Sequence, residues 1–544
     1  MFACTGLLYA QIAERERPDS WNELVQGARF VDRFLPMQGR VLSSDTWGLD
    51  AVRPRWIDNG IESDSWSYWG GNILQAEDGT YHLFVCGWLE GSPRGHMEWG
   101  RSWVFNAVSD NLTGPFRPRQ LIGRGHNPEA FRLKDGRYVI YVIDGCYIAD
   151  DLNGPWQYSK LEFDARDRAI IEGLSNLSFA RRDDGSFVMV CRGGGIWISE
   201  DGLSTYHQVS NGSVYPDVDG RFEDPVIWRD SVQYHLIVND WLGRIAYYLR
   251  SPDGLHWVVD PGEAYVPGIA RHADGTVEDW FKFERLKIFQ DAKGRAIQAN
   301  FAVIDTLKHE DRAFDLHSSK NIGIPLEPGL LLEIVDSHGT NGANGSIVRV
   351  RVKAEPGFDP LHDLDLDSLR LGACEAVNFG RGASVREQVV EGADVVFGFD
   401  RADCEFDDEA FVAKLIGRKL NGDPVFGFAS LSESADTDAM LSPRAPVLSG
   451  GIGERMLSVE VMNLGQRSSD ASSIRVLLSI DGSEACVAES VVPALQPYAN
   501  TTVHLAVKEV YQTVELNPDS QCTVVVEPRS GQRMQYTGHA RFSE

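Results

Sequence analysis

A hairpin-like segment that recurs five times is the feature that most constrains the fold of this chain. Each copy has an apolar strand, an Asp-Gly turn or a variant of it, and a second strand of alternating aromatic and aliphatic residues. The copies follow one another at intervals of roughly 45 to 60 residues, which is the spacing of propeller blades. They are EDGTYHLFV (77–85), KDGRYVIYV (134–142), DDGSFVMVC (183–191), RDSVQYHLIV (229–238) and DAKGRAIQANF (291–301).

A second pattern follows each of the first four copies and completes a four-stranded unit. It predicts a third strand, a turn and an aromatic residue that opens a fourth strand, as in AVSDNLTGPF (107–116) and YLRSPDGLHW (248–257). Residues 70–310 show no sustained helical periodicity, which excludes an α/β barrel. A linear solenoid would need polar caps at both ends, and none is present. We therefore predict an all-β chain with a five-bladed β-propeller.

The repeat ends near residue 330, and two further sets of alternating strands follow it. Both sets are typical of small antiparallel β-sandwiches, and the last one resembles the immunoglobulin-like domains appended to bacterial secreted enzymes. A stretch rich in Ser, Pro, Gly and Asp separates them and reads as a linker. The predicted parts are an N-terminal segment (1–44), the propeller (45–335), a β-sandwich (340–432), the linker (433–454) and an immunoglobulin-like β-sandwich (455–544).

Composition narrows the class of partner. A net charge of −27 over 544 residues argues against a nucleic-acid partner, because the overall field repels phosphate. No run of about 18 apolar residues is present, so no membrane span is expected. The eight cysteines form no CxxC pair, and most lie in apolar runs, which predicts buried free thiols.

In a propeller the inner strands converge, so the residues that open each inner strand surround one pocket. Alignment of the copies on their hairpin turns predicts which residues form this ring. The second strands return to the same face, and their ends should form its rim. The predicted ring residues are Gly71 and Asn72, His126 and Asn127, Ser175 and Asn176, Glu223 and Asp224, and Glu284 and Arg285; the rim residues are Trp88, Asp144, Arg192, Asp240 and Asp305.

Carboxylates in this ring suggest acid–base chemistry on a glycosidic bond, which needs one protonated and one ionised carboxyl group. Glu223, Asp224 and Glu284 precede apolar strands, so partial desolvation should separate their pKa values. Asp240 and Asp144 are supporting candidates. The alternative is that many Asp and Asn residues in propeller turns only cap their own backbone.

Aromatic and basic residues on the same face are candidates for substrate binding. Flat aromatic rings stack on sugars, although many such rings in a propeller are simply core. Arginines at strand ends, among them Arg101, Arg124 and Arg244, could hold an anionic sugar or pair with nearby carboxylates. The substrate-binding candidates are Trp69, Asn72, Trp88, His126, Asn127, Asn176, Arg192, Trp241 and Arg285.

Three segments, GHNPEAFRLKDGRY (125–138), IEGLSNLSFARRDDGSF (171–187) and RFEDPVIWRDSVQYHLIVND (221–240), resemble the five-bladed propeller glycoside hydrolases of families 43, 117, 32 and 68. The resemblance covers residues 45–330. It implies that Glu172, in a Glu-Gly pair, matches the acid of family 43. The opening of the first blade, SYWGGN (67–72), lacks the family's base aspartate. Asp64, Asp144 or Asp240 could replace it, or His126 could act as the acid.

The expected function is therefore an exo-acting glycoside hydrolase on plant or algal oligosaccharides, which could be anionic. The alternatives are a non-catalytic sugar-binding propeller and a polysaccharide lyase. No cofactor is expected to be required, and a structural calcium ion on the propeller axis is left open. Residues 1–11 lack the basic and apolar regions of an intact signal peptide and read as the stub of a leader or as an ordinary start; the expected location is periplasmic or extracellular. The sequence sets neither the sugar nor the oligomeric state.

Overall fold

A computed structural model describes residues 14–38, 42–43, 46–47, 51–52, 54–313, 315, 319–335, 347–431, 439–480, 483–513, 521–528 and 533–542. Strands dominate these residues, which confirms the predicted all-β class. The helices found there are short, and none of them could span a membrane. They are η1 (Asp19–Glu23), η2 (Phe30–Arg33), η3 (Gly95–Arg101), α1 (Cys374–Val377), η4 (Arg401–Cys404) and η6 (Glu509–Tyr511).

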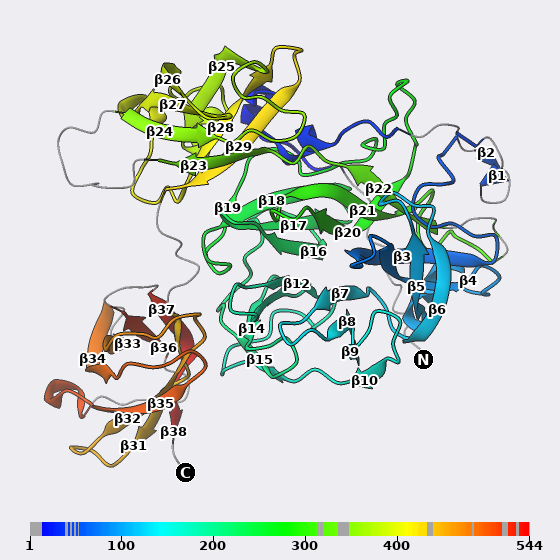
Figure 1. Cartoon of the computed structure of the whole chain (residues 1–544). Helices are drawn as coiled ribbons and strands as arrows, with labels where there is room; N and C mark the ends of the chain where they lie inside the picture. Colours follow the sequence, from blue (N-terminus) through cyan, green and yellow to red (C-terminus); the bar gives the residue numbers. More distant parts are fainter. Residues whose placement is uncertain are drawn as a thin grey trace.

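Five sheets, which we call sheets 1 to 5, follow one another along the chain and pair their strands in chain order (Figure 1). Sheet 3 also carries β11 (Phe163–Asp164), parallel to β15. The sheets are β3 (Trp66–Gln75), β4 (Tyr81–Leu89), β5 (Trp103–Ser109) and β6 (Arg117–Arg124); β7 (Glu129–Arg132), β8 (Tyr138–Val142), β9 (Gly145–Ala149) and β10 (Gln157–Ser159); β12 (Ser178–Arg181), β13 (Phe187–Val190), β14 (Ile196–Ser199) and β15 (Tyr206–Gln208); β16 (Phe222–Arg229), β17 (Tyr234–Asp240), β18 (Ile245–Ser251) and β19 (Val258–Val259); and β20 (Lys282–Gln290), β21 (Ala296–Ile304) and β22 (Ser319–Pro325).

The first strands of the five sheets lie around one centre. β3 contacts β7, β12 contacts β16, β16 contacts β20, and β20 contacts β3, so the last sheet returns to the first. Just before β7 and β12, the Asn127 amide donates a hydrogen bond of 3.1 Å to Asn176 Oδ1. The five first strands therefore form a closed ring.

All five predicted hairpins are confirmed as the connections between first and second strands. Four of the turns contain a glycine with φ between +82° and +93°, a conformation that residues with a Cβ adopt only at a cost. In the fourth sheet the Asp230 carboxylate replaces the glycine, because it accepts hydrogen bonds from the backbone of Val232 and Gln233. The four turn glycines are Gly79, Gly136, Gly185 and Gly294.

Sheet 5 has three strands, and the segment before sheet 1 extends it. Ile61 and Asn321 exchange backbone hydrogen bonds of 3.0 and 3.4 Å. Gly60 makes this approach possible: its φ is +68°, and a Cβ there would lie 1.8 Å from the Asn321 carbonyl oxygen. The chain that enters sheet 1 is thus tied to the last strand of sheet 5.

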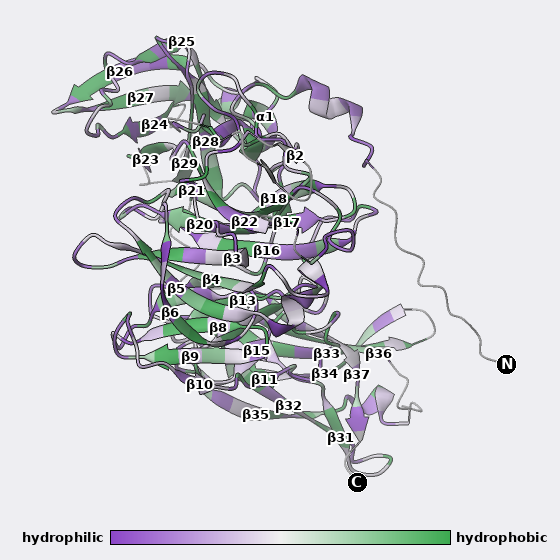
Figure 2. Ribbon diagram, turned by 90° about the vertical axis from the view of Figure 1, so that its right-hand side faces the viewer, coloured by the Kyte–Doolittle hydropathy of each residue, from purple (hydrophilic) through white to green (hydrophobic). Residues whose placement is uncertain are grey.

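The N-terminal residues pack against sheets 4 and 5. Phe30 is buried against Trp228 and Tyr248, and the Trp47 ring packs edge-on against Trp280. Hydrophobic residues, green in Figure 2, run through the strands of the sheets. The two short strands of this segment are β1 (Thr46–Trp47) and β2 (Ala51–Val52).

Seven strands between residues 330 and 430 form a second unit. The first residues of β23 pair in parallel with β29, and its later residues pair with β24, so β23 joins two groups of strands. Val350, Phe397 and Leu415 from both groups share one core. The strands are β23 (Leu330–Ile334), β24 (Ile347–Val352), β25 (Leu364–Gly372), β26 (Val385–Glu391), β27 (Asp394–Asp400), β28 (Val412–Lys419) and β29 (Pro424–Ser430). The unit therefore begins at β23, which lies inside the range predicted as propeller (45–335).

Two sheets that share a core form the C-terminal module. Val459 and Val503 come from one sheet, and Val476 and Val524 come from the other. One sheet contains β30 (Leu441–Pro443), β31 (Val447–Ser449), β32 (Met456–Asn463), β35 (Asn500–Ala506) and β38 (Arg541–Phe542); the other contains β33 (Ser472–Ile480), β34 (Ser483–Val492), β36 (Gln521–Glu527) and β37 (Met534–His539).

The predicted linker, 433–454, is wrong over most of its length. β30 and β31 lie within it, and both pair with β32 of the C-terminal module. Residues 433–438 lie outside the described residues. The Ser, Pro and Gly content of this segment therefore reflects short edge strands and their turns.

Polar contacts fix the C-terminal module to sheet 3. The buried Arg166 donates hydrogen bonds to the backbone oxygen of Ser442 at 2.8 Å and to Glu460 at 3.2 Å. Arg444 binds both oxygens of Asp164 at 3.1 and 2.6 Å. Bidentate pairs of this kind fix orientation as well as contact.

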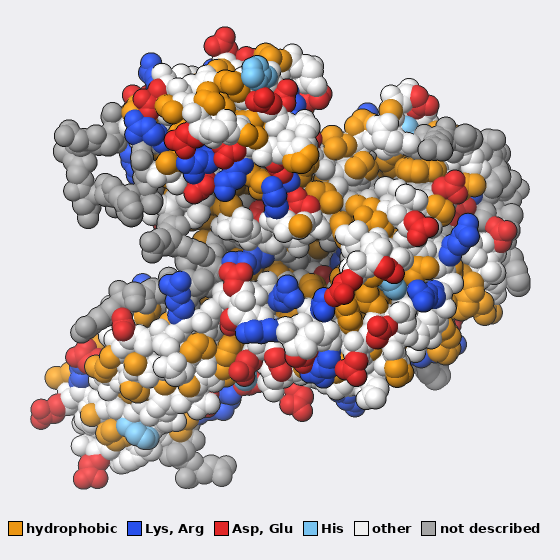
Figure 3. All heavy atoms as spheres, in the orientation of Figure 1, with side chains coloured by type: hydrophobic (Ala, Val, Ile, Leu, Met, Phe, Trp, Pro, Cys, Tyr) orange, Lys and Arg blue, Asp and Glu red, His pale blue; other side chains and the backbone are white. Residues whose placement is uncertain are grey.

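The charged side chains of the surface and the cysteines bear on the expectations from composition. On the face shown in Figure 3, acidic and basic side chains are interspersed rather than separated. The seven cysteines within the described residues are unpaired, and all except Cys486 are buried, as predicted.

Candidate active site

Each of the five first strands contains, or follows by two residues, a residue in the left-handed region. In β3, β16 and β20 these residues lie at shifts in strand register, where a bulge turns the chain. Asn and Asp tolerate positive φ fairly well, but an Arg adopts it at a cost that points to a functional constraint. The residues, which we call the central ring, are Gly70 (φ 38°), Asn127 (53°), Asn176 (51°), Asp224 (56°) and Arg285 (53°).

The central ring lines one small hollow, which we call the central hollow. Gly70 leaves room in it, because a Cβ there would lie only 3.1 Å from Arg285 Cβ and 3.5 Å from Asn127 Oδ1. Asn127 Oδ1 and Arg285 Nε are buried and have no hydrogen-bond partner within the described residues. Such groups are the ones a polar ligand would satisfy.

Asp224 is the buried acid of the central ring. Its carboxylate contacts the Arg285 guanidinium and accepts a hydrogen bond of 3.3 Å from the Arg285 backbone N–H. Burial raises the pKa of Asp224 to about 6; Arg285 opposes this shift, and Glu284 and Glu223 contribute to it. A carboxyl group with this pKa can carry a proton near neutral pH.

Glu284, the residue before Arg285, has the opposite behaviour. It is 1% exposed and contacts two ammonium groups, Lys282 at 3.3 Å and Lys308. Although burial opposes ionisation, the two lysines together hold the pKa of Glu284 well below its usual range. The central hollow therefore has a proton-holding carboxyl group and, nearby, a permanently ionised one.

A second pair of carboxylates, Glu223 and Glu172, lies at the rim. Arg192 contacts Glu223 at 2.9 Å and Glu172 at 3.7 Å. The Glu223 side chain is 15% exposed and that of Glu172 is 57% exposed. Glu172 is thus largely in solvent, whereas Glu223 is sheltered and charge-paired.

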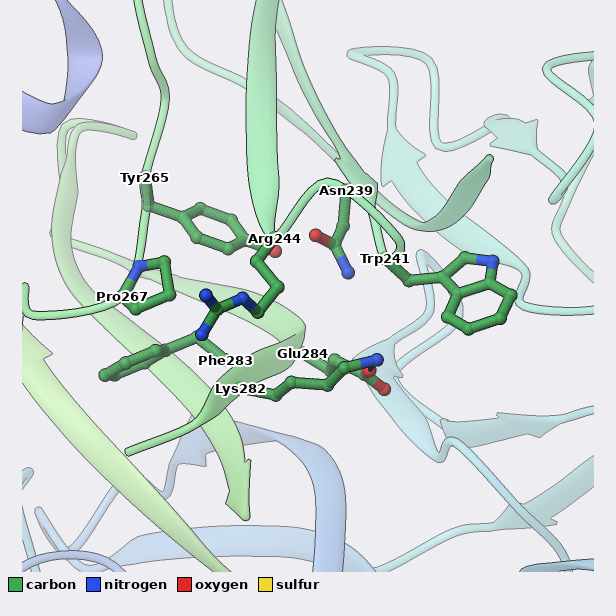
Figure 4. A pocket seen from close by; sticks show the side chains of 8 residues that line it. All are labelled: Asn239, Trp241, Arg244, Tyr265, Pro267, Lys282, Phe283 and Glu284. Carbon is green, nitrogen blue, oxygen red and sulfur yellow. Dashed lines mark hydrogen bonds and ion pairs between the residues drawn. The ribbon is translucent and has the colours of Figure 1, made fainter. Parts of the chain in front are cut away.

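A second small hollow opens beside the central ring, and we call it the side hollow. In Figure 4 the Arg244 side chain passes below Tyr265 toward Pro267 and Phe283, and Asn239 and Trp241 lie on the other side of the view. Lys282 extends toward Glu284, with its ammonium 4.9 Å from the centre of the Trp241 ring. Glu284 belongs to both neighbourhoods, since Arg285 beside it lines the central hollow.

At each of the five sheets one residue of the predicted ring lines the central hollow, and at the first sheet this residue is Gly71. Asn127, Asn176, Asp224 and Arg285 lie in the central ring. Asn72 does not, which corrects its assignment: its amide bonds both the N–H and the carbonyl of Ala130 and so joins sheets 1 and 2.

Two supporting carboxylates have other positions than predicted. Asp240 is fully buried; it contacts Arg15 and accepts hydrogen bonds of 3.0 to 3.2 Å from the backbone of Arg221, Leu242 and Gly243. Asp240 therefore shapes a turn. Asp144 lies in the exposed turn between β8 and β9 and lines neither hollow.

The aromatic candidates divide into core and pocket residues. Trp69 and Trp88 are wrong as stacking surfaces, because both are buried in a cluster with Cys86. His126 is also buried, its Nδ1 is 3.0 Å from Ser102 Oγ, and burial holds its pKa well below the usual value. Trp241 is partly exposed and lines the side hollow.

The sequence pattern does not predict four residues that lie in or beside the two hollows: Gly70, Lys282, Lys308 and Tyr265. Lys282 could have been found, because side chains two residues apart on a strand share a face and Lys282 stands two before Glu284. Lys308 and Tyr265 come from loops outside the repeat, so no register predicts them.

The residues present do not suit a calcium ion on the axis. Arg285 brings a positive charge into the central ring, and its guanidinium already contacts Asp224. No group of three His, Cys, Asp or Glu side chains among the described residues is arranged to hold a metal. We therefore assign no metal to the site.

No protein-family model and no curated protein matches the chain. Solved structures match at low similarity. A family 117 glycoside hydrolase produced by the marine bacterium Zobellia galactanivorans is 11% identical, with a TM-score of 0.34, over 54% of this chain and 89% of its own. An alpha-L-arabinofuranosidase from Lactobacillus brevis is 12% identical, with a TM-score of 0.34, over 47% and 89%. A GH43 protein from Bacillus licheniformis is 9% identical, with a TM-score of 0.32, over 89% of each chain.

These matches include families 43 and 117, two of the four families that the sequence resembles. Because the TM-scores and identities are low, the likeness assigns no role to any residue of this chain.

Proposed function

We propose that this chain is a glycoside hydrolase whose five sheets are the blades of a five-bladed β-propeller. The observation that carries the proposal is the opposed titration of Asp224 and Glu284, on adjoining sheets of the ring. Glycosidic bonds are broken by one protonated and one ionised carboxyl group. Environments that push two carboxyl pKa values apart identify such a pair.

Asp224 is the proposed general acid. Protonated, it donates to the oxygen of the departing group as the bond to the anomeric carbon breaks. Its burial favours the neutral form, which is the form that can donate. Once ionised, it is stabilised by the adjacent Arg285 guanidinium.

Glu284 is the proposed ionised partner. Clamped by Lys282 and Lys308, it presents a fixed negative charge to the positive charge that develops on the sugar ring. It either activates water or attacks the anomeric carbon. The two routes give products of opposite anomeric configuration, which nuclear magnetic resonance of the first product distinguishes.

Closure of the ring supports action on chain ends. Five first strands surround the central hollow, which favours a chain end over a long internal stretch. We further propose plant or algal oligosaccharides as substrates, a periplasmic or extracellular location, and an immunoglobulin-like C-terminal sandwich.

The test is a screen of the purified chain against plant and marine oligosaccharides, with Asp224→Asn and Arg137→Gln alongside. Reducing ends and ultraviolet absorbance are followed together. We expect reducing ends without absorbance, lost in Asp224→Asn and kept in Arg137→Gln, whose arginine lies in an exposed hairpin turn. An unsaturated, absorbing product would indicate a lyase instead. Binding without any cleavage would indicate a sugar-binding protein.

A further inference from the structure

The side hollow contains an arginine with no acidic partner among the described residues. Arg244 donates a weak hydrogen bond of 3.4 Å to the Phe281 carbonyl oxygen, and its guanidinium lies 4.8 Å from the centre of the Phe281 ring. Other arginines of this region, Arg15, Arg192 and Arg285, each contact a carboxylate. In a chain with a net charge of −27, an arginine left without such a partner in a hollow is notable.

The backbone is built to present Arg244 to the hollow. Its φ is +50°, a conformation that costs free energy for a residue with a long side chain. The turn that imposes it is held by Asp240, which accepts hydrogen bonds from Leu242 and Gly243. Arg15 in turn contacts Asp240. Strain of this kind persists where the surrounding structure fixes it, often at a binding site.

Three further polar groups face the same space. The Tyr265 hydroxyl is buried and has no hydrogen-bond partner within the described residues. Asn239 is 2% exposed and directs its amide into the hollow (Figure 4). The Lys282 ammonium lies beside Glu284 at 3.3 Å. The hollow thus offers a guanidinium, a phenol, an amide and a nearby ammonium as hydrogen-bond donors. Glu284 also lines it, and the charge of this carboxylate is balanced by Lys282 and Lys308.

We propose that the side hollow binds an oxyanion carried by the sugar substrate, either the carboxylate of a uronic acid or a sulfate ester. The planar donors of Arg244 suit the geometry of such a group, and charge-assisted hydrogen bonds are the strongest that a sugar site can make. A neutral hydroxyl would leave the arginine without a counter-charge. The inference rests on the proposed function, because it takes the ligand to be the sugar bound at the central ring.

The test measures glycan binding separately from cleavage. Acidic oligosaccharides from pectin and from sulfated algal polysaccharides are arrayed with neutral counterparts from arabinan, galactan and agarose. The probe is the full-length Asp224→Asn protein, so that bound glycans are not cleaved. We expect binding to at least one acidic glycan in clear preference to the neutral ones. Uronates and sulfates on the same array show which oxyanion is recognised.

Substitution of Arg244 then assigns the preference to this hollow. Arg244→Gln should weaken binding of the acidic glycan by about tenfold to a hundredfold, since hydrogen bonds to charged groups are among the strongest. Arg244→Lys should recover part of the loss, and Arg137→Gln should change nothing. Circular dichroism and the melting temperature establish that each variant is folded.

The proposal is overturned if neutral glycans bind as well as acidic ones, if no acidic glycan binds, or if folded Arg244→Gln keeps wild-type affinity. It stands or falls separately from catalysis. Acidic-glycan binding that needs Arg244, without cleavage by the wild-type protein, would refute the hydrolase and keep the oxyanion site. Cleavage of neutral glycans that Arg244→Gln leaves unchanged would refute the oxyanion site and keep the hydrolase.

Discussion

Asp224 and Glu284 show how burial and neighbouring charge move two similar side chains in opposite directions. Both are almost completely buried, so desolvation raises the pKa of each. For Glu284, two lysines outweigh desolvation; for Asp224, a single arginine is opposed by two nearby carboxylates. The chemistry of the site therefore lies in the placement of Lys282 and Lys308 as much as in the carboxylates.

The first prediction concerns the pH dependence of kcat/KM. The acid must be protonated, so activity should be steady at low pH and fall as pH rises through about 6, the pKa of Asp224. Glu284 is ionised throughout this range and adds no limb. A pH–rate profile checks this, and a profile that stays flat to pH 8 would remove Asp224 from the acid role.

The free energy of unfolding should depend on pH through the same carboxyl group, that of Asp224. Because the pKa of Asp224 is raised from 3.8 to about 6 in the folded state, the folded protein binds more protons in this window. Stability should therefore fall as pH rises from about 4 to 6 and then level off. Denaturant unfolding of wild type against Asp224→Asn isolates this contribution, and the variant should lack the decline.

Glu284→Gln should destabilise the protein as well as inactivate it. The substitution removes the counter-charge of Lys282, which is 4% exposed, and of Lys308. Breaking one side of a buried ion pair costs about 3 kcal/mol or more. Urea unfolding measures the loss. A variant that is inactive but as stable as wild type would show that the lysines find other partners.

At the scale of elements, Gly60 marks the contact between the chain entering sheet 1 and the last strand of sheet 5. Gly60→Ala should cost at least about 3 kcal/mol, because its Cβ would meet the Asn321 carbonyl at 1.8 Å and its φ is positive. Gly79→Ala is the matched control, with φ +88° and open space around the new Cβ, and should cost about 1 to 2 kcal/mol. Equal losses in thermal unfolding would mean that this contact contributes no stability.

The hairpins could be predicted from sequence because each depends on a local signal, a turn residue between two strands. The central ring could be predicted only in part. Gly71 and the four later ring positions follow the hairpin register, but at sheet 1 a register shift between Trp69 and Gly71 also brings in Gly70, and Asn72 lies outside the hollow. The sequence predicts Asp240 as a supporting catalytic carboxylate because it does not reveal the contact with Arg15, which lies far away in the sequence. No local pattern reveals such a contact.

At the scale of the whole molecule, the strands that join modules were the ones misassigned. β23 pairs with β29, almost one hundred residues later, and β30 and β31 depend on β32. Pairing of this kind is fixed by the tertiary structure. The sequence pattern alone therefore placed β23 at the end of the propeller and placed β30 and β31 in a linker. The order of the modules followed from where the repeat ends.

The contact between sheet 3 and the C-terminal module should couple their unfolding. Arg166→Ala combined with Arg444→Ala removes the buried bonds to Ser442 and the bidentate pair with Asp164. We expect the module to unfold in a separate transition at lower temperature in scanning calorimetry. Arg475→Ala, which affects an ion pair within the module, is the control. A single unchanged transition in the double variant would show that apolar contacts alone hold the module.

The assignment of Asp224 as the general acid is tested most directly by comparing wild type with Asp224→Asn on two glycosides of the sugar that the screen identifies. One has an alkyl leaving group that needs a proton, and the other a 2,4-dinitrophenyl group that departs without one. We predict that Asp224→Asn loses about a hundredfold or more in kcat/KM on the alkyl glycoside and loses little on the 2,4-dinitrophenyl glycoside. An equal loss on both would contradict the assignment of Asp224 as the acid.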